Sequence, residues 1–250
     1  MNEKQIEHPI RIDISMYNSD GSFTPSAYQR MIMSMIEEHL DILKIGEKHL
    51  MDQHGISWVL LSTSIELKRK LQPTDKLIGR TWHAGGRVPS FRRDFIFEDE
   101  NGEVAAVGAT VSTLFEYESR KLCLNKDKLS VVDLDCGEHV LESLERKMKT
   151  DAELATVETR TIRPSMTDGV GHVNNTKYGD LVYDAMSPED RARLSDLKRL
   201  DIWFNYELRE NGTVEILKAE AENVLYFTGK RADGKSSFDM KISFFDGELN

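Results

Sequence analysis

The chain has 250 residues, of which 39% are hydrophobic and 30% are charged. These proportions are typical of a globular protein and exclude a collagen-like, a disulfide-scaffold or a wholly disordered chain. The net charge of −10 argues against a nucleic-acid-binding protein, because such proteins normally carry a basic surplus. No apolar run approaches the roughly 20 residues of a membrane span. Residues 1–13 have no signal-peptide core, so we expect a cytoplasmic protein.

The cysteines and histidines give no sign of a metal site. The two cysteines, Cys123 and Cys136, are too few for a disulfide framework and lack the spacing of metal ligands. In a cytosolic setting we expect both to be reduced thiols. The seven histidines are scattered, with no HExxH sequence and no paired Cys/His cluster. We therefore expect neither a metal nor a cofactor.

The first half is predicted to be one long helix followed by an antiparallel sheet. An alternating run over 10–17 indicates a strand, and Thr24-Pro25-Ser26 indicates a helix start. Apolar residues at helical spacing extend this helix to about Lys44, with Gly46 as its stop. Strand-like runs follow, with a hairpin turn at Asn101-Gly102 between the last two. These runs cover 57–61, 65–67, 76–82, 92–98 and 104–115.

The second half repeats this order. A strand-like run at 157–163 precedes Asp168-Gly169, as the first run precedes Asp20-Gly21, and a helix is predicted from about 175 to 186. Further strands are predicted at 201–209, 213–223, 224–230 and 236–245. We infer a tandem repeat of an α+β unit. Its parts are an N-terminal repeat (1–122), a solvated, partly helical connector (123–155) and a C-terminal repeat (156–250).

Burial explains why each half needs the other. An amphipathic helix covers only one face of a curved sheet, and a free sheet edge exposes unpaired backbone groups. Pairing the two copies edge to edge removes two edges. We therefore expect one continuous antiparallel sheet with a helix packed in the concave side of each half.

Residues 171–178, GHVNNTKY, are the most informative segment. They lie between a predicted strand and a predicted helix, where free backbone N–H groups gather. Such donors suit a developing oxyanion, which makes Val173, Asn174 and Asn175 candidate oxyanion residues. His172 beside them can titrate or hydrogen-bond near neutral pH. A capping turn with a solvent-facing histidine explains the same residues, and spacing alone leaves both interpretations open.

This segment resembles the acyl-ACP thioesterase family in its order His172-Val173-Asn174-Asn175-x-x-Tyr178, with Asp168 four residues before the histidine. The resemblance extends over about residues 8–245. It implies a tandem (double) hotdog fold, in which a shared antiparallel sheet wraps two helices. It also implies hydrolysis of the thioester between a fatty acyl chain and acyl carrier protein, which terminates fatty acid synthesis. First-half segments that share the resemblance are 58–60, 65–67, 81–82, 91–95 and 119–122.

The resemblance further implies an active site. Its Asp and His correspond to Asp168 and His172, but Val170 replaces the Asn expected two residues before the histidine. Valine has no side-chain hydrogen-bonding group, so the usual polar network is incomplete. By position the family's Glu is best matched by Glu210, and Glu207 is the competitor.

The chemistry implied is attack by water. Asn211 stands where some members of the family have a cysteine, so no thiol nucleophile is expected there. Glu210 would act as the general base, His172 would orient the thioester or assist proton transfer, and Asp168 would hold the histidine.

The family's acyl tunnel is in the first repeat. Candidate lining residues are Met31 and Met35 of the predicted helix, with Trp58, Leu60 and Trp82 from the strands. Methionine packs adaptably around a flexible chain, although ordinary core packing explains these residues equally.

The partners implied are acyl carrier protein and a fatty acyl chain. Because the carrier and this chain are both acidic, a local basic patch must attract the carrier. An acyl-CoA thioesterase on the same fold would instead need a compact basic cluster for the phosphates of coenzyme A. Val170 favours a third alternative, a non-catalytic acyl-binding protein, and a homo-oligomer is left open. Candidate basic segments are 68–70, 92–93, 191–193 and 198–199.

Overall fold

The structure is a computed structural model that describes residues 4–86, 88–132, 134 and 137–246. The first half contains β1 (Gln5–Ile10), α1 (Pro25–Ile42), α2 (Glu47–His54), β2 (Ile56–Leu67), β3 (Leu77–His83), β4 (Ser90–Asp99), β5 (Val104–Glu116) and β6 (Lys121–Leu122). A short helix, α3 (Lys126–Leu129), follows. The second half contains β7 (Ala155–Thr161), α4 (Lys177–Ala185), α5 (Pro188–Ala192), β8 (Leu197–Phe204), β9 (Thr213–Ala221), β10 (Val224–Arg231) and β11 (Ser236–Phe244).

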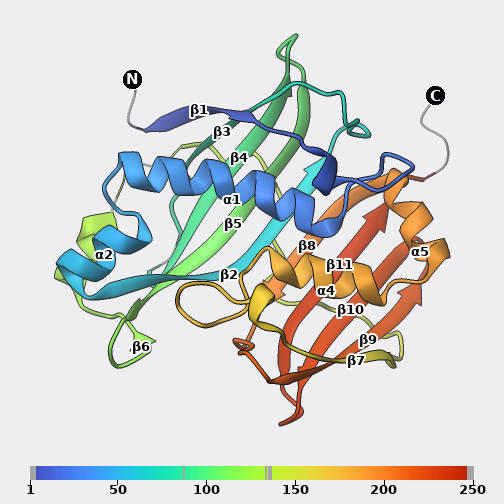
Figure 1. The fold of residues 1–250 in the computed structure, drawn as a ribbon. Coiled ribbons are helices and arrows are strands. Elements are labelled where there is room, and N and C mark those ends of the chain that lie inside the picture. Colours follow the sequence, from blue (N-terminus) through green and yellow to red (C-terminus); the bar gives the residue numbers. More distant parts are fainter. Residues whose placement is uncertain (1–3, 87, 133, 135–136, 247–250) are drawn as a thin grey trace.

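All strands belong to one antiparallel sheet with two equivalent halves. Its order is β1-β3-β4-β5-β2-β8-β11-β10-β9-β7, with β6 paired to β5. Each strand of the first half except β6 has a counterpart in the second. The halves join where β2 pairs with β8, Ser62 opposite Trp203. The helices α1 and α4 lie on the same face of the sheet, each across its own half (Figure 1). The predicted α+β tandem hotdog is confirmed.

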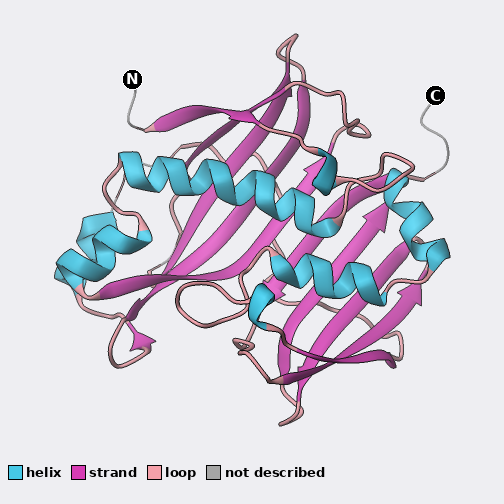
Figure 2. Cartoon of the chain, viewed as in Figure 1, coloured by secondary structure: helices cyan, strands magenta, loops and turns pink. Residues whose placement is uncertain are grey.

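Helix α1 packs closely onto the first half of the sheet. Thr24 caps it by accepting a hydrogen bond from the Ala27 N–H, and Pro25 occupies its first turn. A Cβ at Gly79 of β3 would lie 2.6 Å from the Met35 sulfur, so glycine permits this approach. One cluster of buried apolar side chains runs through both halves and includes residues of α1, of α4 and of the strands. Figure 2 shows both helices, in cyan, on one face of the sheet.

Two element predictions are wrong in the first half. The strand predicted at 10–17 ends at Ile10, because the Asp13 side chain accepts the Ser15 N–H and starts a 3-10 helix. The first helix ends at Ile42, close to the predicted end at about Lys44, but Gly46 is not its stop, since Lys44 already adopts a left-handed φ of 58°. Gly46 is instead the N-cap of α2, which we did not predict.

The connector is largely solvent-exposed and carries the short helix α3, as predicted, but it is anchored to the sheet at several points. Leu141 is buried with Val107 and Ala109 of β5. Trp82 and Trp203 donate their indole N–H groups to connector carbonyls, those of Glu138 and Glu145. The domain boundaries at 122/123 and 155/156 stay a prediction.

One of the two cysteines lies within the described residues. Cys123 is a buried free thiol, and burial raises its pKa. Cys136 lies outside the described residues. In the described parts of the chain, no helix is both long enough and apolar enough to cross a membrane.

A turn before each main helix has the same backbone in both halves. Asn18 donates its N–H to the Ser22 carbonyl at 3.0 Å, and Asp168 donates to the His172 carbonyl at 2.9 Å. A glycine of positive φ, 85° in one turn and 80° in the other, precedes Ser22 and His172. The repeat therefore places a serine in the first half where the second half has an imidazole.

A close approach of the two main helices at Gly179 gives a test of the fold. A Cβ at Gly179 of α4 would lie 2.4 Å from the backbone nitrogen of Ser26 in α1. Overpacking typically costs about 1–3 kcal/mol, whereas alanine gains at most about 1 kcal/mol of helix propensity. We expect Gly179→Ala to lower the free energy of unfolding in urea. Gly169→Ala, with nothing within 4 Å, is the control. Equal losses in the two variants would contradict the packing described.

Candidate active site

Asp168 shapes the turn that carries His172. Its carboxylate oxygen Oδ1 accepts the Val170 N–H at 3.0 Å and the His172 N–H at 3.4 Å. These bonds hold the backbone of the turn, so Asp168 orients the histidine through its main chain rather than through its ring. Val170 is 46% exposed, and its N–H donates the hydrogen bond to Asp168 that helps to form the turn.

Glu207 contacts the His172 ring. The distance from His172 Nε2 to Glu207 Oε2 is 2.8 Å, and Arg120 Nη2 lies 2.6 Å from the same oxygen. Arg120 Nη2 is also 3.0 Å from His172 Nε2. An arginine can only donate, so the contacts are satisfied when Arg120 and the Nε2–H of His172 both donate to Oε2. Arg209 Nη2 holds the other carboxylate oxygen, Oε1, at 2.6 Å.

The structure brings Glu207, and not Glu210, to the histidine. The segment runs alongside the site turn, with a bridge between His172 and Arg209. Side chains alternate in extended backbone, so Glu207 and Arg209 face the site while Leu208 is buried between them. Glu210 lies past this alternation, where its carboxylate is 3.5 Å from Asn211 Nδ2.

The surroundings of the pair set its charge state. Burial lowers the pKa of His172, and the charges of Arg120 and Arg209 lower it further, against the opposing effects of Glu207 and Asp168. Burial would raise the pKa of Glu207, but the hydrogen bond from Arg209 and the charges of His172 and Arg120 outweigh it. The pKa of Glu207 is therefore lowered as well. At neutral pH the site holds a carboxylate and a neutral imidazole.

Two of the three predicted oxyanion donors are already engaged. The Val173 N–H donates to the Leu208 carbonyl at 2.8 Å, and the Asn174 N–H to the Met166 carbonyl at 2.9 Å. Asn175 differs, because no acceptor for its N–H is found among the residues described. Its carbonyl accepts the Gln29 side-chain amide of α1 at 2.7 Å.

The residues predicted to line an acyl tunnel do not all face α1. Met31 and Met35 are buried between α1 and the sheet. Trp58 donates its indole N–H to Ile45 near α2, and Leu60 is half-buried on β2. Trp82 is on the opposite face, because Gly79, three residues earlier on β3, faces α1. Its indole N–H bonds to the connector, so it does not belong to this set.

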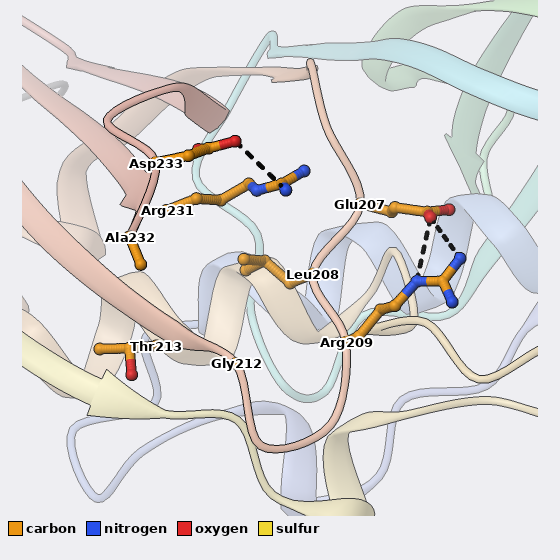
Figure 3. A pocket seen from close by; sticks show the side chains of 8 residues that line it. All are labelled: Glu207, Leu208, Arg209, Gly212, Thr213, Arg231, Ala232 and Asp233. Atoms are coloured by element: carbon orange, nitrogen blue, oxygen red, sulfur yellow. Dashed lines mark hydrogen bonds and ion pairs between the residues drawn. The ribbon is translucent and has the colours of Figure 1, made fainter.

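A groove of about 320 Å³ borders Glu207. It lies between the segment after β8 and the turn that joins β10 to β11. Figure 3 shows the Glu207–Arg209 pair on one side of it and the Arg231–Asp233 pair on the other. In this view the Glu207 and Arg209 side chains point away from Arg231 and Asp233, while Leu208 points toward them, so the groove borders the segment that carries Glu207 rather than its carboxylate. The residues lining the groove are Glu207, Leu208, Arg209, Gly212, Thr213, Arg231, Ala232 and Asp233.

Known proteins share this fold over its full length. An acyl-ACP thioesterase from Bacteroides thetaiotaomicron is 21% identical, with a TM-score of 0.84, covering 98% of this chain and 100% of that one. The 12:0-ACP thioesterase from Umbellularia californica is 16% identical, with a TM-score of 0.78, covering 96% of this chain and 97% of that one. Comparison with curated protein sequences gives no match.

Two domain matches define the class as a thioester hydrolase. The acyl-ACP thioesterase N-terminal domain matches residues 6–130, and the acyl-ACP thioesterase C-terminal domain matches residues 149–245. The chain belongs to the acyl-ACP thioesterase family. Its substrates are accordingly fatty acyl-ACP thioesters, as the resemblance in the sequence implied.

Two residues of the site were not predicted from the sequence. Arg120 and Arg209 both donate to the Glu207 carboxylate. Arg120 is part of segment 119–122, which contributes to the family resemblance, but no spacing rule connects it to His172 and Glu207, which are 52 and 87 positions away. Arg209 could have been found from the sequence, because it is two residues after Glu207 and side chains at that spacing in an extended segment point to the same face.

Proposed function

We propose that this chain hydrolyses fatty acyl-ACP with Glu207 as the general base. The observation that carries the proposal is the 2.8 Å contact between Glu207 Oε2 and His172 Nε2. An ionised carboxylate held by an imidazole can take a proton from water, provided that water reaches it. Glu207 replaces Glu210 in this role.

Hydrolysis proceeds by removal of a proton from water, attack on the thioester carbon and loss of the carrier sulfur. Glu207 removes a proton from water while the water oxygen bonds to the thioester carbon. The carbonyl oxygen becomes an oxyanion, to which Asn175 offers its N–H. Collapse of this intermediate breaks the C–S bond, and the leaving sulfur takes the proton held by Glu207. The products are a free fatty acid and the thiol of the carrier. His172 keeps the carboxylate in place, and Asp168 keeps the histidine in place.

The basic segments predicted to attract the carrier are largely paired with acids. Lys68 contacts Glu66, and Lys70 contacts Asp196. Arg92 contacts Asp94 and Arg199 contacts Asp201, while Arg93 is buried. These pairs leave little unbalanced charge for a carrier, so they do not support docking there. A cytoplasmic location and a homo-oligomer stay predictions.

Matched acyl-ACP and acyl-CoA substrates of several chain lengths test this function. We expect faster release of fatty acid from acyl-ACP than from acyl-CoA at every length that is hydrolysed. A preference for acyl-CoA would favour the acyl-CoA thioesterase, and tight acyl binding without turnover on either carrier would favour the binding protein.

The charge state of the site predicts a pH profile. Activity needs ionised Glu207, and it is expected to be highest with neutral His172, because a protonated His172 would form an ion pair with Glu207 and make it a weaker base. The pKa of each group lies below its ordinary value. Both groups therefore lose their active form only as the pH falls below about 6.5, the ordinary histidine value. We expect kcat/KM for acyl-ACP to be near its maximum at pH 7 and to decline in more acidic buffers. An acid limb with its midpoint above pH 7 would contradict this assignment.

A further inference from the structure

Arg120 reaches the site from the other half of the molecule. It lies in the turn between β5 and β6, in the first repeat, whereas His172 and Glu207 belong to the second. The backbone of the turn is tightly bent at this residue, with a φ of 52° and an N–H bond to the Glu116 carbonyl at 2.9 Å. Glu116 is itself held by Lys128 at 2.6 Å, which anchors the base of the hairpin.

The contacts of Arg120 are with the two groups on which hydrolysis depends. Its Nη2 is 2.6 Å from Glu207 Oε2 and 3.0 Å from His172 Nε2. Arg209 binds the other oxygen of Glu207 from the same segment. Arg120 of the first repeat and Arg209 of the second thus each bind one oxygen of the Glu207 carboxylate. Of these two arginines, Arg120 binds the oxygen that also contacts the imidazole.

We infer that Arg120 is a positioning residue of the hydrolytic site, supplied by the first repeat, which fixes Glu207 Oε2 against His172. The inference rests on the proposed function. It means that the site is built from both halves, although every catalytic group belongs to the second. A free carboxylate can rotate about its terminal bonds, and donors on both oxygens restrict this rotation to one orientation.

The charged and polar groups that face His172 and Glu207 come from several elements. Arg120 is on the β5–β6 turn, Arg209 follows β8, Asp168 is on the site turn, and the buried Tyr178 hydroxyl is on α4. Of these, Arg120 and Arg209 lower the pKa of both His172 and Glu207. Removing Arg120 therefore raises both pKa values while Arg209 remains bound to Oε1. The acid limb of the activity profile must then move to higher pH.

Arg120→Gln and Arg120→Lys test the inference in the full-length protein, with Lys121→Gln as the control. Lys121 is the next residue along, is exposed and carries the same charge, so it matches Arg120 for long-range attraction of the carrier. We expect Arg120→Gln to lower kcat for acyl-ACP by roughly 10- to 100-fold, with KM changed by less than about threefold. Its acid limb should move upward, and Arg120→Lys should recover part of both losses. Unchanged kcat and acid limb in Arg120→Gln would overturn the inference.

An NMR titration gives a readout that needs no activity. The His172 ring signal, assigned with His172→Gln, should titrate at higher pH in Arg120→Gln than in wild type and should be unaffected in Lys121→Gln. An unchanged His172 titration in Arg120→Gln would overturn the contact even in an active enzyme. A shifted titration in a protein that releases no fatty acid would instead leave the contact standing and refute the proposed function.

Discussion

Replacing Glu207 with glutamine is expected to lower kcat for acyl-ACP hydrolysis by about 10²- to 10⁴-fold, the usual contribution of a general base. Glutamine retains the shape and one acceptor oxygen, so it can still bind Arg120 or Arg209, but it cannot take a proton from water. The change removes chemistry while leaving most of the surroundings intact. Steady-state hydrolysis of one acyl-ACP, with KM measured alongside, reports the effect.

Glu210→Gln is the matched comparison, because it removes the same charge three residues away. Its carboxylate makes one weak contact with Asn211 and none with His172, so we expect activity within about twofold of wild type. A large loss in Glu210→Gln with activity retained in Glu207→Gln would restore Glu210, the first choice from the sequence, as the base.

The second large effect is expected at His172. Truncation to alanine removes the Nε2–H that holds Glu207 Oε2, and it leaves the carboxylate with its two arginines alone. We expect His172→Ala to lower kcat by roughly 100-fold, as misplacement of a reacting group by about 1 Å does. The measurement is kcat for acyl-ACP, with the midpoint of urea unfolding to confirm that the protein is folded.

His172→Gln separates positioning from proton transfer. The glutamine amide can place an N–H donor near the position of Nε2 but cannot titrate. If the histidine acts by holding Glu207, this variant should keep clearly more activity than His172→Ala. Equal losses in the two variants would show that the imidazole itself transfers a proton.

The fold was predictable because the same pattern occurs twice. A strand, a turn ending in Asp-Gly or a similar pair, a helix and four strands recur in both halves, and period-two alternation marks most of the strands. The need to cover exposed edges then predicts that the copies pair side by side, which β2 and β8 do. Local rules failed where one side chain redirects the backbone, as Asp13 does after β1.

The site was predictable in part. His172 and Asp168 follow from a local motif, but Glu207 depends on how an extended segment lies beside that motif. A shift of one residue in such a segment turns every side chain to the other face, and no local spacing distinguishes Glu207 from Glu210. The engaged N–H groups of Val173 and Asn174 likewise depend on carbonyls from other parts of the chain. Long-range pairing of this kind leaves no signal in a single sequence.

In the proposed mechanism, water activated by Glu207 attacks a fatty acyl-ACP thioester. A single turnover in H₂¹⁸O, with enzyme in excess over acyl-ACP, tests this step. If Glu207 acts as a base, the fatty acid released in that first turnover carries one ¹⁸O atom. If Glu207 instead attacks the thioester itself, water can open the resulting anhydride at the Glu207 carbon, and the fatty acid then carries ¹⁶O from the enzyme. Unlabelled fatty acid, or no fatty acid, would contradict the mechanism proposed.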